Sequence, residues 1–292
     1  MEINMKKIKI VSDSSSDMLK LDGIDFASVP LKIATSEREF VDDEKLDIDE
    51  MIAFLDTYKG KSRSSCPNTN DWIEAFGDAE YIFGLTITKH LSGSFNSAQQ
   101  AAAAYMDEHP GRVVYIIDSL STGPEMMMIV DKIRQCEAQG LDFEATKAAV
   151  LDYANHNHTL FCLESMMNLA RNGRTSMAVA KIAGMLGIRV VGDVEGGQIT
   201  PVYKPRGAKK ATQTLFEMMK ERGFRDGNIL RIAHCFGEEQ ALALRDVVLA
   251  EFPNTKFKLE PTTALCSFYA EAGGLIIGFE GDFNEKNDNT KF

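Results

Sequence analysis

Three loops rich in hydroxyl groups follow segments that the sequence predicts to be β-strands, and their residue types suit the binding of an anion. The clearest is TKHLSGSFNSA, where Ser92, Gly93 and Ser94 stand between a predicted strand and an alanine-rich helix. A helix N-terminus leaves backbone N–H groups unpaired and carries about half a positive charge, so it can hold an anionic group. The alternative is that these residues only cap the helix.

The other two loops are VSDSSSDM and SRSSCPN. In open α/β sheets, ligands bind beyond the carboxyl ends of the strands, so Ser64 and Ser65 are candidates for binding an oxyanion. Asp13 and Ser14 could also bind a ligand, although a structural role that ties loops together is favoured for Asp13. Together the three loops predict a convergent site for a small oxyanion.

A positive partner for that anion is found in NLARNGRTS, which carries Arg171 and Arg174. A helix that stops at a glycine and is followed by a planar guanidinium could clamp a carboxylate or a phosphate. The simpler alternative is a surface arginine beside a helix C-terminus. The basic stretch PVYKPRGAKKAT is typical of a solvated helix start, but it could also contact an acidic partner or anionic lipid headgroups.

The sequence gives little indication of a nucleotide-binding loop, a hydrolase triad or a metal site. The chain has no GxxxxGK[ST] phosphate loop and no Ser-His-Asp order that would indicate a hydrolase. His156 and His158 have no convincing third ligand and no cysteine pair has CxxC spacing, so no metal site is expected. His90 adjoins the Ser92 turn and could line the oxyanion site. The fourteen methionines are most simply core residues, although pliable side chains beside an anion site would suit an amphiphile.

The elements that must position these residues alternate between strand and helix in the first half of the chain. Strands are expected at 7–13, 26–33, 81–88 and 112–118, and helices at 47–59, 67–78, 93–106, 123–140 and 142–157. This alternation predicts βαβ crossovers and a mostly parallel sheet.

In the second half of the chain, expected strands outnumber expected helices. Strands are expected at 158–164, 188–204, 228–235, 256–263 and 275–281, with helices at 208–222 and 237–251. Gly196-Gly197 is a hairpin signal, so part of this sheet should be antiparallel. We therefore predict an α/β fold with two domains, residues 1–157 and 158–282, and a frayed polar tail at 283–292.

Composition narrows the class of protein. The 292 residues include 32 basic and 43 acidic side chains, and the net charge of −11 argues against general affinity for nucleic acid. The N-terminus lacks the apolar run of a signal peptide, and no stretch of about 18 apolar residues could span a bilayer. The five scattered cysteines fit reduced thiols. A cytoplasmic protein is expected.

In the order of its motifs the chain resembles the DegV family of bacterial fatty-acid-binding proteins along nearly its whole length. The motifs are IVSDSSSDM, SSCPN as a variant of the family's TSQPS-like loop, TKHLSGSFNSA, DSLSTGPE, NLARNGRTS and GQITPVYKPRGAKKA. Each is modest alone, but six in the family's order are quite specific.

The resemblance implies a two-domain protein that is not itself an enzyme and needs no cofactor. It would bury the acyl chain of a long-chain fatty acid in the N-terminal domain and bind the carboxylate near the domain junction, at Ser64 or Ser65 and at Ser92, with Arg174 nearby. It further implies an acyl-carrying subunit that presents the carboxylate to a separate fatty acid kinase subunit. Transient contact with a membrane surface is also considered.

Two departures from the family pattern bear on the headgroup. Ser64 stands where the family usually has threonine, and CSFYAEAGG places Tyr269 about where the family often has a histidine, so a phenol would replace an imidazole as donor. Two alternatives to a carrier stay open: a phosphate- or nucleotide-handling enzyme that uses the same Ser/Gly turn, and a regulatory interaction protein without ligand.

Overall fold

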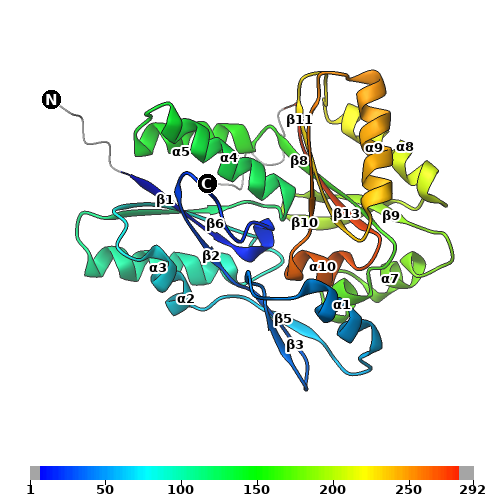
Figure 1. Ribbon diagram of the computed structural model, residues 1–292, viewed down its shortest axis with the longest axis horizontal. Coiled ribbons are helices and arrows are strands. Elements are labelled where there is room, and N and C mark those ends of the chain that lie inside the picture. The colour runs from blue at the N-terminus through cyan, green and yellow to red at the C-terminus, as the bar shows by residue number, and fades with distance from the viewer. Residues whose placement is uncertain (1–6, 283–292) are drawn as a thin grey trace.

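The computed structural model describes residues 7–282, which form two main β-sheets with helices packed against both (Figure 1). The first sheet has the order β2-β1-β6-β7, and all neighbouring strands in it are parallel. The carboxyl ends of its strands therefore meet at one edge. The strands are β1 (Ile8–Asp13), β2 (Asp25–Val29), β6 (Tyr81–Thr86) and β7 (Val113–Asp118).

Helices cover both faces of this sheet because its strands are apolar on both sides. Ile10 of β1 packs with the cluster under α4 and α5, whereas its neighbour Val11 packs with the cluster under α2 and α3. Asn68 caps α2 in a capping box with Asp71. The helices are α2 (Thr69–Phe76), α3 (Ser94–Glu108), α4 (Pro124–Ala138) and α5 (Phe143–Ala154).

The second sheet is mixed, with the order β10-β9-β8-β13-β11-β12. Only β11 and β12 pair in parallel, and β9 and β10 form the hairpin that Gly196-Gly197 predicts, with positive φ at both glycines. The strands are β8 (Asn157–Leu163), β9 (Val190–Glu195), β10 (Gln198–Tyr203), β11 (Ile229–Cys235), β12 (Lys256–Pro261) and β13 (Gly274–Glu280).

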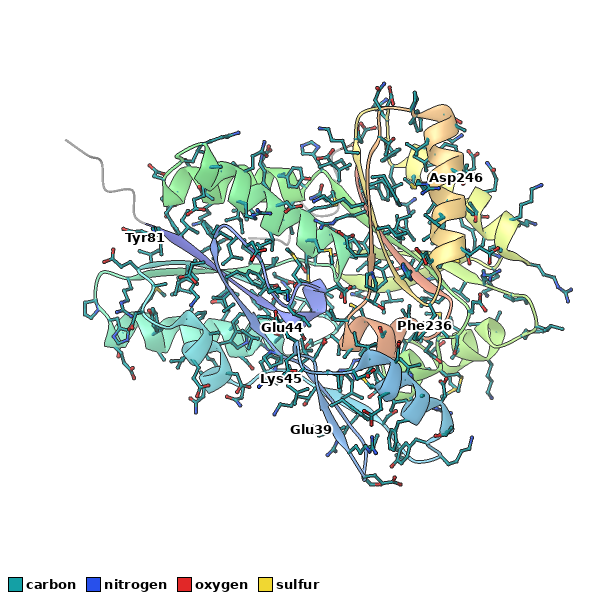
Figure 2. The ribbon with its side chains drawn as sticks, viewed as in Figure 1. Glu39, Glu44, Lys45, Tyr81, Phe236 and Asp246 are labelled. Atoms are coloured by element: carbon teal, nitrogen blue, oxygen red, sulfur yellow. The ribbon has the colours of Figure 1, made fainter. Side chains whose placement is uncertain are left out.

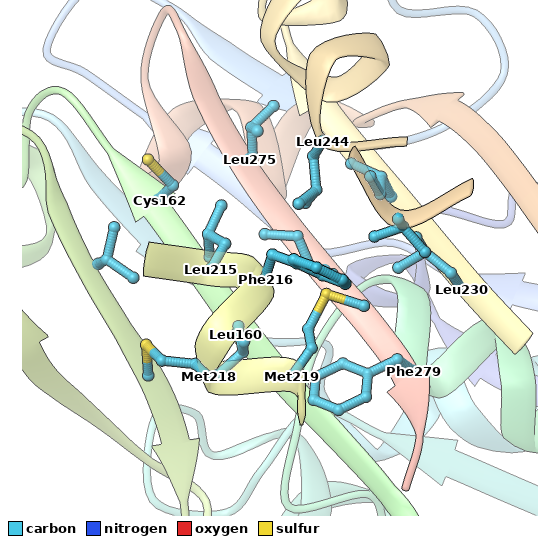
Figure 3. Packing of buried hydrophobic residues seen from close by; sticks show 14 of the residues in the cluster. Leu160, Cys162, Leu215, Phe216, Met218, Met219, Leu230, Leu244, Leu275 and Phe279 are labelled. Carbon is cyan, nitrogen blue, oxygen red and sulfur yellow. The ribbon is translucent and has the colours of Figure 1, made fainter. Parts of the chain in front are cut away.

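One face of the second sheet is covered by α8 (Ala208–Glu221) and α9 (Glu238–Glu251). Figure 3 shows Leu160 and Phe279 from the strands packed against Leu215 and Met219 of α8. The other face of the same strands packs in part against α4. That other face looks toward the first sheet.

A small third sheet connects the two halves of the chain. Its order is β4-β3-β5, and Ile33 and Phe40 of this sheet pack with Phe268 of α10. The sequence predicts one extended segment over 26–33, and this is wrong, because the chain leaves the first sheet after β2 and enters the third. The elements are β3 (Lys32–Ala34), β4 (Glu39–Val41), α1 (Ile48–Thr57), β5 (Arg63–Ser65) and α10 (Ala264–Ala270).

The helix α4 lies between the two large sheets, where it contacts β8, β11 and β13 (Figure 1). Polar contacts fasten it there. Thr159 of β8 donates to Glu125 over 2.7 Å, and the buried Arg231 of β11 bonds Asp131 over 2.8 Å. The two sheets are thus held by a shared helix as well as by the third sheet.

The predicted α/β class and the two sheets, one parallel and one mixed, are confirmed. The helix end predicted in NLARNGRTS is α6 (Met167–Arg171), whereas two short helices were not expected: α10 and, between α6 and β9, α7 (Met177–Ala183). The boundary at 157–158 falls at the first residues of β8 and stays a prediction. The predicted tail at 283–292 lies outside the described residues. No helix within residues 7–282 is long and apolar enough to cross a membrane.

Candidate functional site

A cavity of about 300 Å³ lies between the carboxyl edge of the first sheet and the face of the second sheet that carries Phe161 and Ile276. Most of its wall is apolar, and its polar lining includes Ser64, Arg174 and Tyr269, which lie close together. The apolar lining is Leu31, Ile87, Leu91, Phe161, Leu163, Leu169, Val194, Ile199, Leu265, Ala270 and Ile276. The remaining lining is Ser64, Ser65, Cys66, Ser92, Gly93, Thr122, Thr159, Arg174, Cys266 and Tyr269.

The alternation of side chains along β8 explains the apolar wall. Successive residues of a strand point to opposite faces. Leu160 and Cys162 therefore face α8 and α9, while Phe161 and Leu163 face the cavity. Ile276 of β13 continues the same wall.

A tyrosine and a serine from distant parts of the chain meet at the polar part of the cavity. The Ser64 Oγ and Tyr269 Oη atoms lie 2.6 Å apart and share a hydrogen bond. Burial raises the pKa of the Tyr269 phenol, so it stays protonated and able to donate at neutral pH. Both hydroxyl groups are thus available to an acceptor that enters between them.

Arg174 supplies the positive charge of the cavity wall. Its Nε donates to the carbonyl of Leu91 over 3.2 Å and its Nη1 donates to the carbonyl of Asn172, while the guanidinium carbon lies 5.8 Å from the centre of the Tyr269 ring. It forms no ion pair with any residue in 7–282. The guanidinium is held by neutral groups, and its charge is therefore left for a ligand.

The turn before α3 brings Ser92 and Gly93 to the same wall. Gly93 is the N-cap residue of α3, and the Ser92 Oγ atom accepts from the amide of Ser94, the first residue of the helix, over 3.2 Å. A Cβ at this glycine would lie only 3.1 Å from the Cys66 Sγ atom. The glycine therefore allows the turn and the loop that carries Cys66 to come together beside the cavity.

Ser94, Ser14 and His90, which the sequence also singled out, do not line the cavity. Ser94, expected to bind the ligand, instead donates from Oγ to the Asp13 carboxylate over 2.6 Å, because it faces the interior behind the turn. Ser14 accepts from the amide of Leu31 over 3.0 Å. His90 lies against the tip of the β9–β10 hairpin, close to Gly197.

Asp13 has the structural role that the sequence favours for it. Its carboxylate is fully buried and also accepts from the amide of Ile87 over 3.0 Å and from the Ser15 hydroxyl. Burial raises its pKa to about 6, against the effect of these hydrogen bonds. Asp13 thus fixes the ends of β1 and β6 and the start of α3, which together set the position of Ser92.

A second pair of carboxyl groups anchors the helix that carries Tyr269. Asp42 accepts from the amides of Ala264 and Leu265, and Asp17 accepts from the amide of Thr263. The Asp17 Oδ2 atom is buried without a partner among the described residues, and desolvation raises the pKa of this carboxyl to about 8. These contacts tie the start of α10 to the loops after β1 and β4.

The sequence missed the contribution of the second half of the chain to the cavity. Phe161, Ile199 and Ile276 line it, as do Thr159 and Cys266. The alternation in HTLFCLE could have identified Phe161 as facing away from the main core. The methionine clusters, by contrast, pack in the core, and no methionine within residues 7–282 lines the cavity.

No group of three or more His, Cys, Asp or Glu side chains within residues 7–282 is placed to hold a metal ion. The arrangement is instead an apolar space with several neutral donors and one arginine at its polar part. Such a site can bind an amphiphile by burying its chain and donating hydrogen bonds to its anionic group.

Comparison with known proteins supports this description. Residues 7–281 match a family model described as an uncharacterised protein of the DegV family. A DegV domain-containing protein of Streptococcus pneumoniae is 39% identical over 279 residues, which cover 94% of this chain and 99% of that protein.

Two solved structures are similar over nearly the whole chain. A DegV family protein from Eubacterium eligens loaded with heptadecanoic acid has a TM-score of 0.92 at 39% identity. The Streptococcus pneumoniae fatty acid kinase (Fak) B3 protein loaded with linoleic acid has a TM-score of 0.92 at 38% identity. Each match covers 94% of this chain and 100% of the other.

Proposed function

The chain belongs to the DegV family, and on that premise we propose that it is a carrier that binds a long-chain fatty acid. The acyl chain would occupy the apolar part of the cavity between the two sheets. The carboxylate would lie at the polar part, beside Ser64, Ser92 and Arg174. The observation that supports this proposal most strongly is the grouping of Ser64, Tyr269 and Arg174 in the wall of a mainly apolar cavity.

Burial of the acyl chain supplies most of the affinity in this proposal. Each buried CH₂ contributes about 0.8 kcal/mol, and the cavity offers leucine, isoleucine, valine and phenylalanine side chains to it. The carboxylate adds selectivity over neutral lipids, because a hydrogen bond to a charged group contributes about 1.5 to 3 kcal/mol. Chain length and saturation are set by the closed part of the cavity.

The headgroup site would consist of Ser64, Ser65, Ser92, Arg174 and Tyr269, with the turn at Gly93 beside them. The Ser64 and Tyr269 hydroxyls share a hydrogen bond of 2.6 Å. A carboxylate has two oxygens with about four acceptor positions, so it can accept from both hydroxyls at once. Tyr269 would then donate where a histidine is usual in the family.

We further propose that the chain presents the bound carboxylate to a separate kinase subunit. The similar Fak B3 protein is a component of a fatty acid kinase by its name. This chain has no GxxxxGK[ST] loop to bind the nucleotide itself, which is consistent with a carrier rather than a catalyst. The acyl carboxylate would be the group that is phosphorylated.

A surface near the cavity suits transient contact with a membrane, and we propose that ligand is exchanged there. Met177, Met185 and Leu186, in α7 and just after it, are exposed, Leu186 by 89% of its surface. Tyr203 of β10 is also exposed, and basic side chains follow it from Lys204 onward. Apolar side chains with nearby cations favour binding to anionic bilayers.

We propose a cytoplasmic location and no binding to nucleic acid. All five cysteines are free, as expected in a reducing compartment, and the net charge is −11.

Native mass spectrometry of the purified chain tests the fatty acid proposal. A mass increment that matches a fatty acid, released by denaturation and identified after extraction, is expected. A chain that neither carries nor takes up fatty acid, and is stabilised instead by ATP with magnesium, would contradict it.

A further inference from the structure

A second pocket, on the surface next to the headgroup site, is lined by cations. It has a volume of about 670 Å³ and is formed by the end of β3, the connection from α1 to β5 and the end of α6. Its charged lining consists of Lys59, Lys61, Arg63 and Arg171, and no carboxylate is among its lining residues. The hydroxyl groups of Thr35, Ser36 and Ser62 complete the polar lining.

The four cations have no anionic partner within residues 7–282. Each is exposed, and none forms an ion pair or a side-chain hydrogen bond with a described residue. The other surface pockets differ, since one combines Arg189 and Lys209 with Glu164 and Glu239, and another contains Asp131 and Glu137. In a chain with a net charge of −11, four uncompensated cations around one hollow form a local positive field that attracts small multivalent anions.

The basic pocket shares two chain segments with the headgroup site. Arg63 precedes Ser64 on β5, and Arg171 lies three residues before Arg174. A hydrogen bond from Asn172 Nδ2 to the carbonyl of Ser62, over 3.3 Å, joins the two segments. The positive pocket and the polar part of the acyl cavity therefore lie on either side of the same short strand and helix end.

From this juxtaposition we propose that the basic pocket binds the phosphate groups of a soluble phosphorylated compound, beside the bound carboxylate. Planar guanidinium groups pair with phosphate oxygens in two parallel hydrogen bonds, and lysines add charge without fixed geometry. A concave site with cations from two segments of the chain suits a compact polyanion. The biological role rests on the proposed carrier function: the pocket would hold the phosphates of the phosphoryl donor where the carboxylate is presented.

Isothermal titration calorimetry with inorganic triphosphate tests the pocket directly, using the full chain in 50 mM and 300 mM salt. We expect one triphosphate to bind per chain, more weakly at high salt because the Debye length shortens. The variant Arg63→Ala with Arg171→Ala should bind at least tenfold more weakly. The matched control Lys45→Ala with Lys256→Ala removes the same charge from exposed lysines outside the pocket and should bind as the original chain does. Figure 2 labels Lys45.

Three outcomes would overturn the proposal: no triphosphate binding, equal losses in both double variants, or cation-dependent binding only to phosphatidylglycerol vesicles. The last result would assign the cations to lipid headgroups instead. Circular dichroism establishes that both variants are folded. Oleate binding by the same preparations separates the two proposals, because a chain that binds oleate but not triphosphate refutes only the basic pocket.

Discussion

The Ser64–Tyr269 pair gives the sharpest prediction for the headgroup site. Replacement of Tyr269 by Phe removes the hydroxyl that pairs with Ser64. The aromatic ring stays, with its centre 5.8 Å from the guanidinium carbon of Arg174. If the phenol donates to the ligand carboxylate, its loss costs about 1.5 to 3 kcal/mol, which weakens fatty acid binding about 10- to 150-fold. The raised pKa of Tyr269 keeps the phenol a donor across neutral pH, so the loss should not depend on pH between 6 and 8.

Calorimetric or fluorescence titration with oleate measures this loss. Ser64→Ala should give a loss of similar size, and the double variant should show a coupling of at least about 0.5 kcal/mol, because both hydroxyls would contact one carboxylate. Tyr58→Phe is a matched control, since Tyr58 Oη also pairs with a serine, Ser36, over 2.8 Å but lies outside the cavity. A change of less than about threefold for Tyr269→Phe, or an equal change for Tyr58→Phe, would refute the assignment.

Three further changes test other parts of the structure. Gly93→Val places side-chain atoms against Cys66 and should weaken oleate binding at least about tenfold in titrations, while the circular dichroism spectrum stays that of the folded chain. In the folded state the pKa of Asp17 is about 8, above its ordinary value of 3.8, so the folded chain holds the carboxyl proton more tightly than the unfolded chain does. The free energy of unfolding should therefore fall as pH rises from about 4 to 8. In urea unfolding, Asp17→Asn should show a flatter decline over this range. Arg231→Ala leaves Asp131 and Glu260 without their buried partner and should lower the free energy of unfolding by about 2 kcal/mol, less than for a fully buried pair because both carboxylates are partly exposed.

Short-range patterns in the sequence were sufficient to predict much of the fold. The parallel sheet follows from the alternation of buried strands with helices, and the β9–β10 hairpin follows from Gly196-Gly197. The third sheet was not predictable in this way, because β3, β4 and β5 are three residues long and their pairing depends on packing against α10, more than two hundred residues away. Such short strands carry too few residues for a periodic signal.

In the candidate site, too, local features could be predicted from the sequence, whereas contacts between distant segments could not. Ser64, Ser92 and Arg174 could be found because loops at strand ends and a residue after a helix stop are local features, and the structure brings all three to one cavity. Ser94 shows the limit of this reasoning, since a serine in such a turn can face either the ligand or the interior, and here it bonds Asp13. The positions of Phe161 and Ile276 depend on how two sheets face each other, which no local pattern records.

A crystal structure of the chain with oleate bound tests most directly whether the cavity holds a fatty acid with its carboxylate among Ser64, Ser92, Arg174 and Tyr269. The predicted result is continuous density along Phe161, Ile199 and Ile276, with carboxylate oxygens within 2.5 to 3.2 Å (roughly the range of hydrogen bonds) of the serine and tyrosine hydroxyls. Density that is absent from the cavity, or that places the carboxylate away from these hydroxyls, would contradict the proposed site.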